Sequence, residues 1–173
     1  ITSPAAALQA ASLLVPKAAQ DANPFFSNAA RHLLHGVLMA LISQAPNRWT
    51  LRHVILILRD ESLLRWVLTN AEVTRHLLQY FEQPVTFQNI LSTIITRMAP
   101  YEIIAATWDR AETKLGLRDW LRGESILVLG NDEDNRVAID TINQLIFKRL
   151  SELILAQPEL APRDTRTTWL LLD

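Results

Sequence analysis

The sequence predicts a mainly α protein, in which a helical module is joined to a partial β-strand, helix, β-strand (βαβ) piece. Over roughly the first 120 residues, apolar side chains recur at helical spacing, with capping residues or prolines between the runs. After Gly123 the pattern changes, because two short apolar runs flank one long helical stretch. These observations place a helical module at 1–122 and an α/β piece at 123–173.

The composition limits the classes of function open to the chain. Its 173 residues are 49% apolar and 20% charged, which suits one domain, or one domain and part of another. The net charge of −1 excludes a global attraction to nucleic acid or acidic lipid, but leaves a local DNA-contacting surface open. The absence of cysteine excludes disulfides and thiolate metal sites. The most apolar stretch, 33–42, is too short to cross a bilayer, so we expect no membrane contact.

Prolines that follow capping residues open the first two helices. Ser3-Pro4 is typical of an N-cap and first helical residue, and predicts a short helix to about Val15. Asn23-Pro24 repeats this signal and predicts a helix over 24–44. The expected buried face of this second helix consists of Phe26, Ala30, Leu33, Val37 and Leu41.

Shorter helical patterns occupy the middle of the chain. The expected helices cover 51–59, 62–68, 71–81, 87–114 and 117–121. Thr50 and Asn70 are expected to cap the first and third of these helices. Pro100 predicts a kink or break in the long fourth helix, because proline removes a helical hydrogen bond.

Two apolar runs after Gly123 predict buried strands. They span 125–130 and 167–172, and between them lie a polar turn at 131–135 and a helix over 134–156. This order predicts parallel strands joined by a right-handed crossover. Because neither run alternates with polar residues, both faces of each strand should be covered. We therefore expect neighbouring strands outside this chain.

The second run ends in Trp169-Leu170-Leu171-Leu172-Asp173, an apolar strand followed by a carboxylate. This is the form of a Walker B motif, in which an Asp at the strand end orients the Mg²⁺ that bridges nucleotide phosphates. Many buried strands end this way, so the motif depends on its structural context. Asp173 is the one candidate for a catalytic and Mg²⁺-site residue.

Several segments resemble TraD/TraG-like type IV secretion coupling proteins. The helix start at 23–31, Leu91-Ser92-Thr93 and Leu117-Arg118-Asp119-Trp120-Leu121 are similar to that family. So are the apolar run from Ile126 to Leu129, the long helix after it and the final Walker B-like strand. The resemblance covers nearly the whole chain in the family's order.

The resemblance implies a part of a hexameric, membrane-anchored P-loop ATPase that couples a relaxosome, or secreted protein substrates, to a secretion channel. Residues 1–122 would belong to an all-α domain, and 123–173 to a RecA-like nucleotide-binding core. The intact parent would bind ATP and Mg²⁺. It would contact DNA or a relaxase, and lie on the cytoplasmic side of the bacterial inner membrane.

The chain departs from that family at the phosphate site. It contains no Gly-x-x-x-x-Gly-Lys-Ser/Thr segment to hold phosphates, and no Glu follows Asp173. The family's membrane-spanning segment is missing as well. We therefore expect no ATP hydrolysis and no bound cofactor for this chain alone, with Asp173 acting only in the intact parent.

Acidic residues at the last predicted helix favour a structural role. Asp132, Glu133 and Asp134 stand at its start, where carboxylates stabilise the N-terminus, so capping is favoured over a metal site. Arg136 follows them and is expected to be solvated rather than to reach a phosphate on a neighbouring subunit. His32 and His35 have a spacing that can bind metal, but without an evident third ligand, surface or hydrogen-bonded histidines are favoured.

Two groups of basic residues include a tryptophan and are candidates for contact with DNA. The groups are Arg48, Trp49, Arg52 and Arg59, and Arg118, Trp120 and Arg122. Either could contact a DNA backbone. Acidic residues such as Asp60 and Asp119 are interspersed, so a solvated face with a partly buried tryptophan is favoured.

Two main hypotheses for the function stay open at this stage, with another DNA-pumping ATPase of the same superfamily as a third. The first is a coupling-protein fragment that recognises relaxosome or substrate at the channel mouth. The second is a stand-alone helical adaptor without nucleotide chemistry. Under the adaptor hypothesis 125–173 should be dispensable or should fold onto the helices, whereas under the first hypothesis the strands should be left with open edges.

Overall fold

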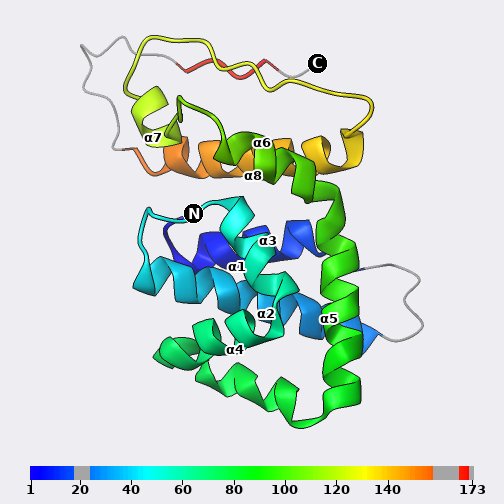
Figure 1. The fold of residues 1–173 in the computed structure, drawn as a ribbon. Helices are drawn as coiled ribbons and strands as arrows, with labels where there is room; N and C mark the ends of the chain where they lie inside the picture. Colours follow the sequence, from blue (N-terminus) through cyan, green and yellow to red (C-terminus); the bar gives the residue numbers. More distant parts are fainter. Residues whose placement is uncertain (18–23, 158–167, 172–173) are drawn as a thin grey trace.

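The computed structural model describes residues 1–17, 24–157 and 168–171, and arranges them in two helical layers (Figure 1). The elements are α1 (Pro4–Leu14), α2 (Pro24–Gln44), α3 (Leu51–Arg59), α4 (Glu61–Asn70), the 3-10 helix η1 (Glu72–Glu82), α5 (Pro84–Met98), the 3-10 turn η2 (Ala99–Tyr101), α6 (Glu102–Asp109), α7 (Leu117–Trp120) and α8 (Arg136–Leu155). One layer holds α1 to α4 and η1, and the other holds α6, α7 and α8. Helix α5 runs along one side and leads from the first layer to the second. The predicted mainly α fold is confirmed.

Capping residues recognised in the sequence begin α1 and α3 as expected, whereas the predicted cap Asn23 lies outside the described residues. The Ser3 hydroxyl accepts a hydrogen bond from the Ala6 N–H at 3.3 Å at the start of α1. Thr50 is the N-cap of α3, and its backbone N–H donates to Nδ1 of His53 at 3.1 Å. These contacts satisfy backbone groups that a helix end leaves without partners, so local sequence sets both boundaries.

The segment after α4 differs from the prediction. Asn70 is the last residue of α4 rather than the cap of the next helix, and 72–82 form a 3-10 helix instead of an α-helix. The buried Thr74 gives a physical reason, because its hydroxyl lies 3.0 Å from the Leu68 carbonyl and 2.9 Å from the Ala71 carbonyl. These contacts satisfy carbonyls at the end of α4 and favour a tighter turn.

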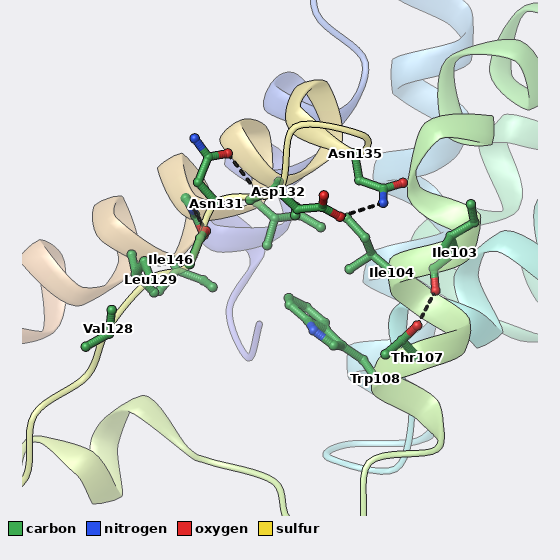
Figure 2. Close-up of a pocket in the computed structure, with 14 residues that line it drawn as sticks. Ile103, Ile104, Thr107, Trp108, Val128, Leu129, Asn131, Asp132, Asn135 and Ile146 are labelled. Atoms are coloured by element: carbon green, nitrogen blue, oxygen red, sulfur yellow. Dashed lines mark hydrogen bonds between the residues drawn. The ribbon is translucent and has the colours of Figure 1, made fainter.

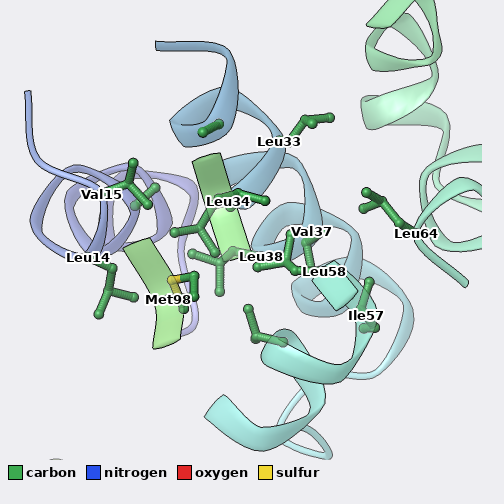
Figure 3. Close-up of a cluster of buried hydrophobic side chains, with 14 of the residues drawn as sticks. Leu14, Val15, Leu33, Leu34, Val37, Leu38, Ile57, Leu58, Leu64 and Met98 are labelled. Carbon is green, nitrogen blue, oxygen red and sulfur yellow. The ribbon is translucent and has the colours of Figure 1, made fainter. Parts of the chain in front are cut away.

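The main hydrophobic core is built around α2. Ala30, Leu33 and Val37 of the predicted apolar face are buried, and Phe26 and Leu41 pack against the core from its edge. Figure 3 shows side chains from the neighbouring elements converging on α2. They include Leu14, Val15, Ile57, Leu58, Leu64 and Met98. Since each fully buried aliphatic side chain contributes about 1.5–3 kcal/mol, this cluster is the main source of stability.

The 3-10 helix η1 packs closely on α2 at Gly36. A methyl group built on Gly36 would overlap Cδ1 of Leu77 and lie 3.3 Å from Cδ2 of Leu68. The missing side chain therefore allows the close approach of two elements. The sequence shows the glycine but does not show which residue needs the space.

Pro100 breaks the long helix predicted over 87–114, as expected. It lies in η2, between α5 and α6, and α6 ends at Asp109 rather than at Lys114. Two polar contacts tie α6 to α3. Nη1 of Arg59 donates to Glu102 at 2.8 Å, and the Thr50 hydroxyl donates to Asp109 at 3.0 Å. Because they lie at opposite ends of α3, these contacts hold the two helices antiparallel.

Helix α8 shares the core of the helical layers. It packs against α1 and η2. Ala138 and Ile142 are buried in the same hydrophobic cluster as α2, and Leu145 and Ile146 pack against that cluster. Helix α8 therefore forms one folded body with the helices that precede it.

The two predicted strands do not form in the part of the chain that the structure describes. Residues 125–130 and 168–171 have no regular secondary structure, and no backbone hydrogen bond joins them. Ile126 and Leu171 are 92% and 93% exposed. A strand needs a partner to satisfy its N–H and C=O groups, and these two short segments have none within the described residues. The expected βαβ piece is thus absent here.

Candidate functional site

A groove lies between α6 and α8 in the second layer (Figure 2). Its main cavity of about 460 Å³ is walled by α6, by residues 128–132 and by the first half of α8. A smaller cavity of about 220 Å³ shares Ile103 and Asn135 with the first and continues to η2. We call the two cavities together the α6–α8 groove.

The walls of the α6–α8 groove are mainly apolar. Figure 2 shows the ring of Trp108 projecting from α6 into the space between the walls. Ile103 and Trp108 are 65% and 46% exposed. The α8 wall presents Ile139, Ile142 and Ile146. Large apolar side chains left in water at one place are typical of an interaction site.

No motif in the sequence marks these groove residues as a site. Helix α6 was predicted as part of a longer amphipathic helix, and its wall partner α8 comes much later in the chain. One local signal existed at Ile103, which falls on the face opposite the buried Tyr101, whereas Trp108 follows Tyr101 and Ala105 at the spacing of one helix face. This signal marks one exposed apolar side chain, but it does not show what lies opposite.

Carboxylates gather at the end of the groove where α8 begins. Asp132 accepts hydrogen bonds from the Asp134 N–H at 3.2 Å and from the Asn135 side chain at 2.8 Å. The N-cap of α8 is Asn135, and no side chain accepts a hydrogen bond at this cap. The predicted capping by Asp132, Glu133 and Asp134 is therefore wrong, because Asp132 stabilises the preceding turn instead.

The remaining candidates near α8 show no catalytic arrangement. Nε of Arg136 lies 3.6 Å from Asp140 on the exposed side of the helix, so Arg136 is solvated as expected. Across residues 1–17, 24–157 and 168–171, no cluster of His, Asp or Glu is placed to hold a metal ion. Nor is any helix in those ranges long and apolar enough to span a membrane. Asp173 lies outside the described residues, and its role stays a prediction.

Three histidines and a tyrosine meet between α2 and η1. The rings of His32 and His76 are 5.6 Å apart, and Nδ1 of His32 lies 3.1 Å from the Tyr80 hydroxyl. His35 is one turn further along α2, and its buried Nε2 has no hydrogen-bond partner among the described residues. His76 belongs to no pattern in the sequence, because only the packing of η1 on α2 brings it to His32.

The surroundings of the exposed His32 and the half-buried His35 predict a pH-dependent stability. Partial desolvation lowers the pKa of both imidazoles, and nearby His76 lowers the pKa of each further, although a backbone hydrogen bond with Pro4 partly offsets the effect at His35. The unfolded chain therefore binds more protons than the folded protein once the pH falls below about 6.5. Folding stability should decrease as the pH falls through this range.

We expect the urea midpoint of unfolding to fall between about pH 7.5 and pH 5.5, and to fall less in His32→Gln. Glutamine keeps a polar side chain near Tyr80 but does not titrate, so one proton-linked contribution disappears. Chemical denaturation at several pH values measures both proteins. An identical pH dependence in the two would contradict the assignment to His32.

The two groups of basic residues with a tryptophan differ in how many of their arginines form ion pairs with described residues. Arg59 is paired with Glu102, and Trp49 is partly buried against the core. Arg48 and Arg52 form no ion pair with any described residue, and Arg48 is exposed. At the second group, Arg118 and Arg122 are exposed. Nε1 of Trp120 there is buried, with no partner in the described ranges.

Comparison with known protein families identifies a matching family model. The model of a family described as type IV secretion-system coupling protein DNA-binding domain matches residues 1–173. Searches of curated proteins and of solved structures gave no match. The family match spans both helical layers and all the residues discussed above.

Proposed function

The chain belongs to the type IV secretion-system coupling protein DNA-binding domain family, and on this premise we propose that it binds DNA within an ATP-driven secretion motor. The match over the whole of residues 1–173 carries this proposal. The intact parent would be a hexamer anchored in the bacterial inner membrane. On its cytoplasmic side, this region would receive the relaxosome, a relaxase or a secreted protein at the channel mouth.

The exposed apolar segments support a place beside a larger α/β core. Ile126, Val128, Trp169 and Leu171 are all more than three-quarters exposed. Leaving such side chains in water is unfavourable, and further strands would cover them and pair their backbones. In the parent, 123–173 would thus complete a RecA-like core beside the all-α module at 1–122. Asp173 would orient Mg²⁺ there, and the bound nucleotide would be ATP.

One observation favours the alternative of a stand-alone helical adaptor. Helix α8 buries Ala138 and Ile142 in the common core, as expected if the C-terminal part folds onto the helices. This packing accounts for α8 alone, because the apolar segments on either side of it remain exposed. DNA binding is the property that separates the two proposals.

Replacing Arg48 and Arg52 by glutamine is expected to weaken DNA binding by about tenfold at low salt, because two phosphate contacts are lost. The slope of log K against log salt should become about two units shallower on duplex DNA. Fluorescence anisotropy with labelled single-stranded and duplex oligonucleotides measures both quantities.

The matched control for this DNA experiment is Arg136→Gln with Lys148→Gln, which removes the same charge from exposed positions of α8. It should leave the affinity nearly unchanged. Equal losses in both double variants would show only a general charge effect. No measurable DNA binding by the unmodified chain would favour the adaptor.

A further inference from the structure

We propose that the α6–α8 groove binds a cationic amphipathic peptide segment of a partner protein. The apolar face of the segment would lie on Ile103 and Trp108, and its basic side chains would face Asp132, Glu133 and Asp134. This inference goes beyond DNA binding, since it uses neither Arg48 nor Arg52. It rests on the shape, apolar lining and charge of the groove.

The shape of the groove suits an extended row of side chains. The main cavity of about 460 Å³ is within the range of ligand sites. The second cavity of about 220 Å³ lies beside it, on the other side of the shared lining residues Ile103 and Asn135, towards η2. Two neighbouring hollows along one pair of helices accept successive apolar side chains, as grooves that bind amphipathic helices do.

The apolar lining supplies the binding surface. Ile103 and Trp108 project from one wall and remain substantially exposed. Val137 at the second hollow is also exposed, although Ala138 beside it is buried in the core. A partner that covers these side chains removes apolar surface from water, and tryptophan is a frequent energetic anchor on such surfaces.

The charge of the groove determines which kind of segment fits. Its lining contains the carboxylates of Asp132, Glu133 and Asp134. The one basic lining residue, Arg136, is paired with Asp140. Phosphate groups of DNA or acidic lipids would be repelled there, whereas lysine or arginine would be attracted. A purely apolar segment would bury the carboxylates beside it without a partner.

The test uses the full chain and a synthetic helical peptide of leucine and lysine, with the leucines on one face. Anisotropy of the labelled peptide should show saturable binding that weakens with salt. A leucine and glutamate peptide of the same pattern should bind at least about tenfold more weakly. A lysine and serine peptide should also bind weakly, because it lacks the apolar face.

Two variants locate the peptide on the groove. Ile103→Ser should weaken leucine–lysine binding about tenfold, because it removes apolar contact. Glu133→Gln with Asp134→Asn should weaken it about three- to tenfold, as expected for partly exposed charge pairs. The controls are Val85→Ser, and Glu72→Gln with Glu82→Gln. These exposed positions lie around η1 and the start of α5, away from the groove.

Other occupants of the groove give distinct results, each of which would overturn the proposal. Equal binding of the lysine and glutamate peptides would remove the charge argument. An equal loss of binding in the control variants would show that the peptide does not bind at the groove. Displacement of the peptide by a single-stranded oligonucleotide, with loss of oligonucleotide binding in Ile103→Ser, would assign the groove to DNA. A dimer in sedimentation that Ile103→Ser dissociates would assign it to a second copy.

Discussion

Leu77→Ala is expected to lower the free energy of unfolding by about 2–5 kcal/mol, and adding Gly36→Ala should restore part of this loss. Leu77 is 1% exposed, and its side chain occupies the space over Gly36. Removing the leucine leaves a cavity between η1 and α2. A methyl group on Gly36 would fill part of that cavity and add helix propensity of about 1 kcal/mol.

Gly36→Ala in the wild-type background should act in the opposite direction. The new methyl group overlaps a buried side chain, which costs about 1–3 kcal/mol and exceeds or offsets the propensity gain. Chemical denaturation of both single variants and the double variant gives a coupling energy. We expect it to be favourable and about 0.5–3 kcal/mol, as found for residues in contact.

A control glycine distinguishes close packing from backbone effects. A methyl group on Gly123 would meet only carbonyl oxygens, at 3.6 and 3.7 Å, so Gly123→Ala should change stability little. Additive effects of Gly36→Ala and Leu77→Ala would contradict the close approach of η1 to α2. Loss of stability in Gly123→Ala equal to that in Gly36→Ala would show that the backbone, not the contact, is responsible.

Asp173→Asn in the intact parent is expected to reduce ATP turnover by about 10- to 100-fold, as loss of residues that hold metal-bound groups does. This result rests on the proposed motor, in which Asp173 orients the Mg²⁺ at the nucleotide phosphates. Asparagine keeps the shape of the side chain but removes the charge. The measurement is steady-state ATP hydrolysis by the purified parent over a range of Mg²⁺ concentrations.

The control for Asp173 is Asp140→Asn, which removes one exposed carboxylate on α8 and should leave ATP turnover unchanged. DNA binding by the Asp173→Asn parent should also persist, because the proposed DNA contacts lie on another element. Full ATP turnover in Asp173→Asn would refute the Walker B assignment. It would leave family membership and the proposed DNA contacts standing.

The basic and acidic candidate residues show which contacts of charged side chains sequence patterns fail to predict. Arg59 was grouped with Arg48 and Arg52 by its place in the sequence, but its pairing with Glu102 depends on α6 returning to α3. Capping by Asp132 was a reasonable expectation from its place before a helix. It failed because this carboxylate satisfies an N–H and an amide in the preceding turn. Each carboxylate has several neighbouring donors, and sequence alone does not choose among them.

The sequence by itself determined the mainly α fold class, the first helix boundaries and the break at Pro100. These features depend on caps, prolines and apolar spacing within a few residues, so the local chain contains the necessary information. The resemblance to coupling proteins was also readable in the sequence, and the family match over 1–173 confirms it.

Tertiary structure alone decided the contact of Gly36 with Leu77, the grouping of His32 with His76 and the α6–α8 groove. Each joins elements that are distant along the chain, and helix periodicity predicts which face is apolar without predicting what covers it. The same reason explains the absent strands at 125–130 and 168–171. A strand exists only with its partners, and the described residues supply none.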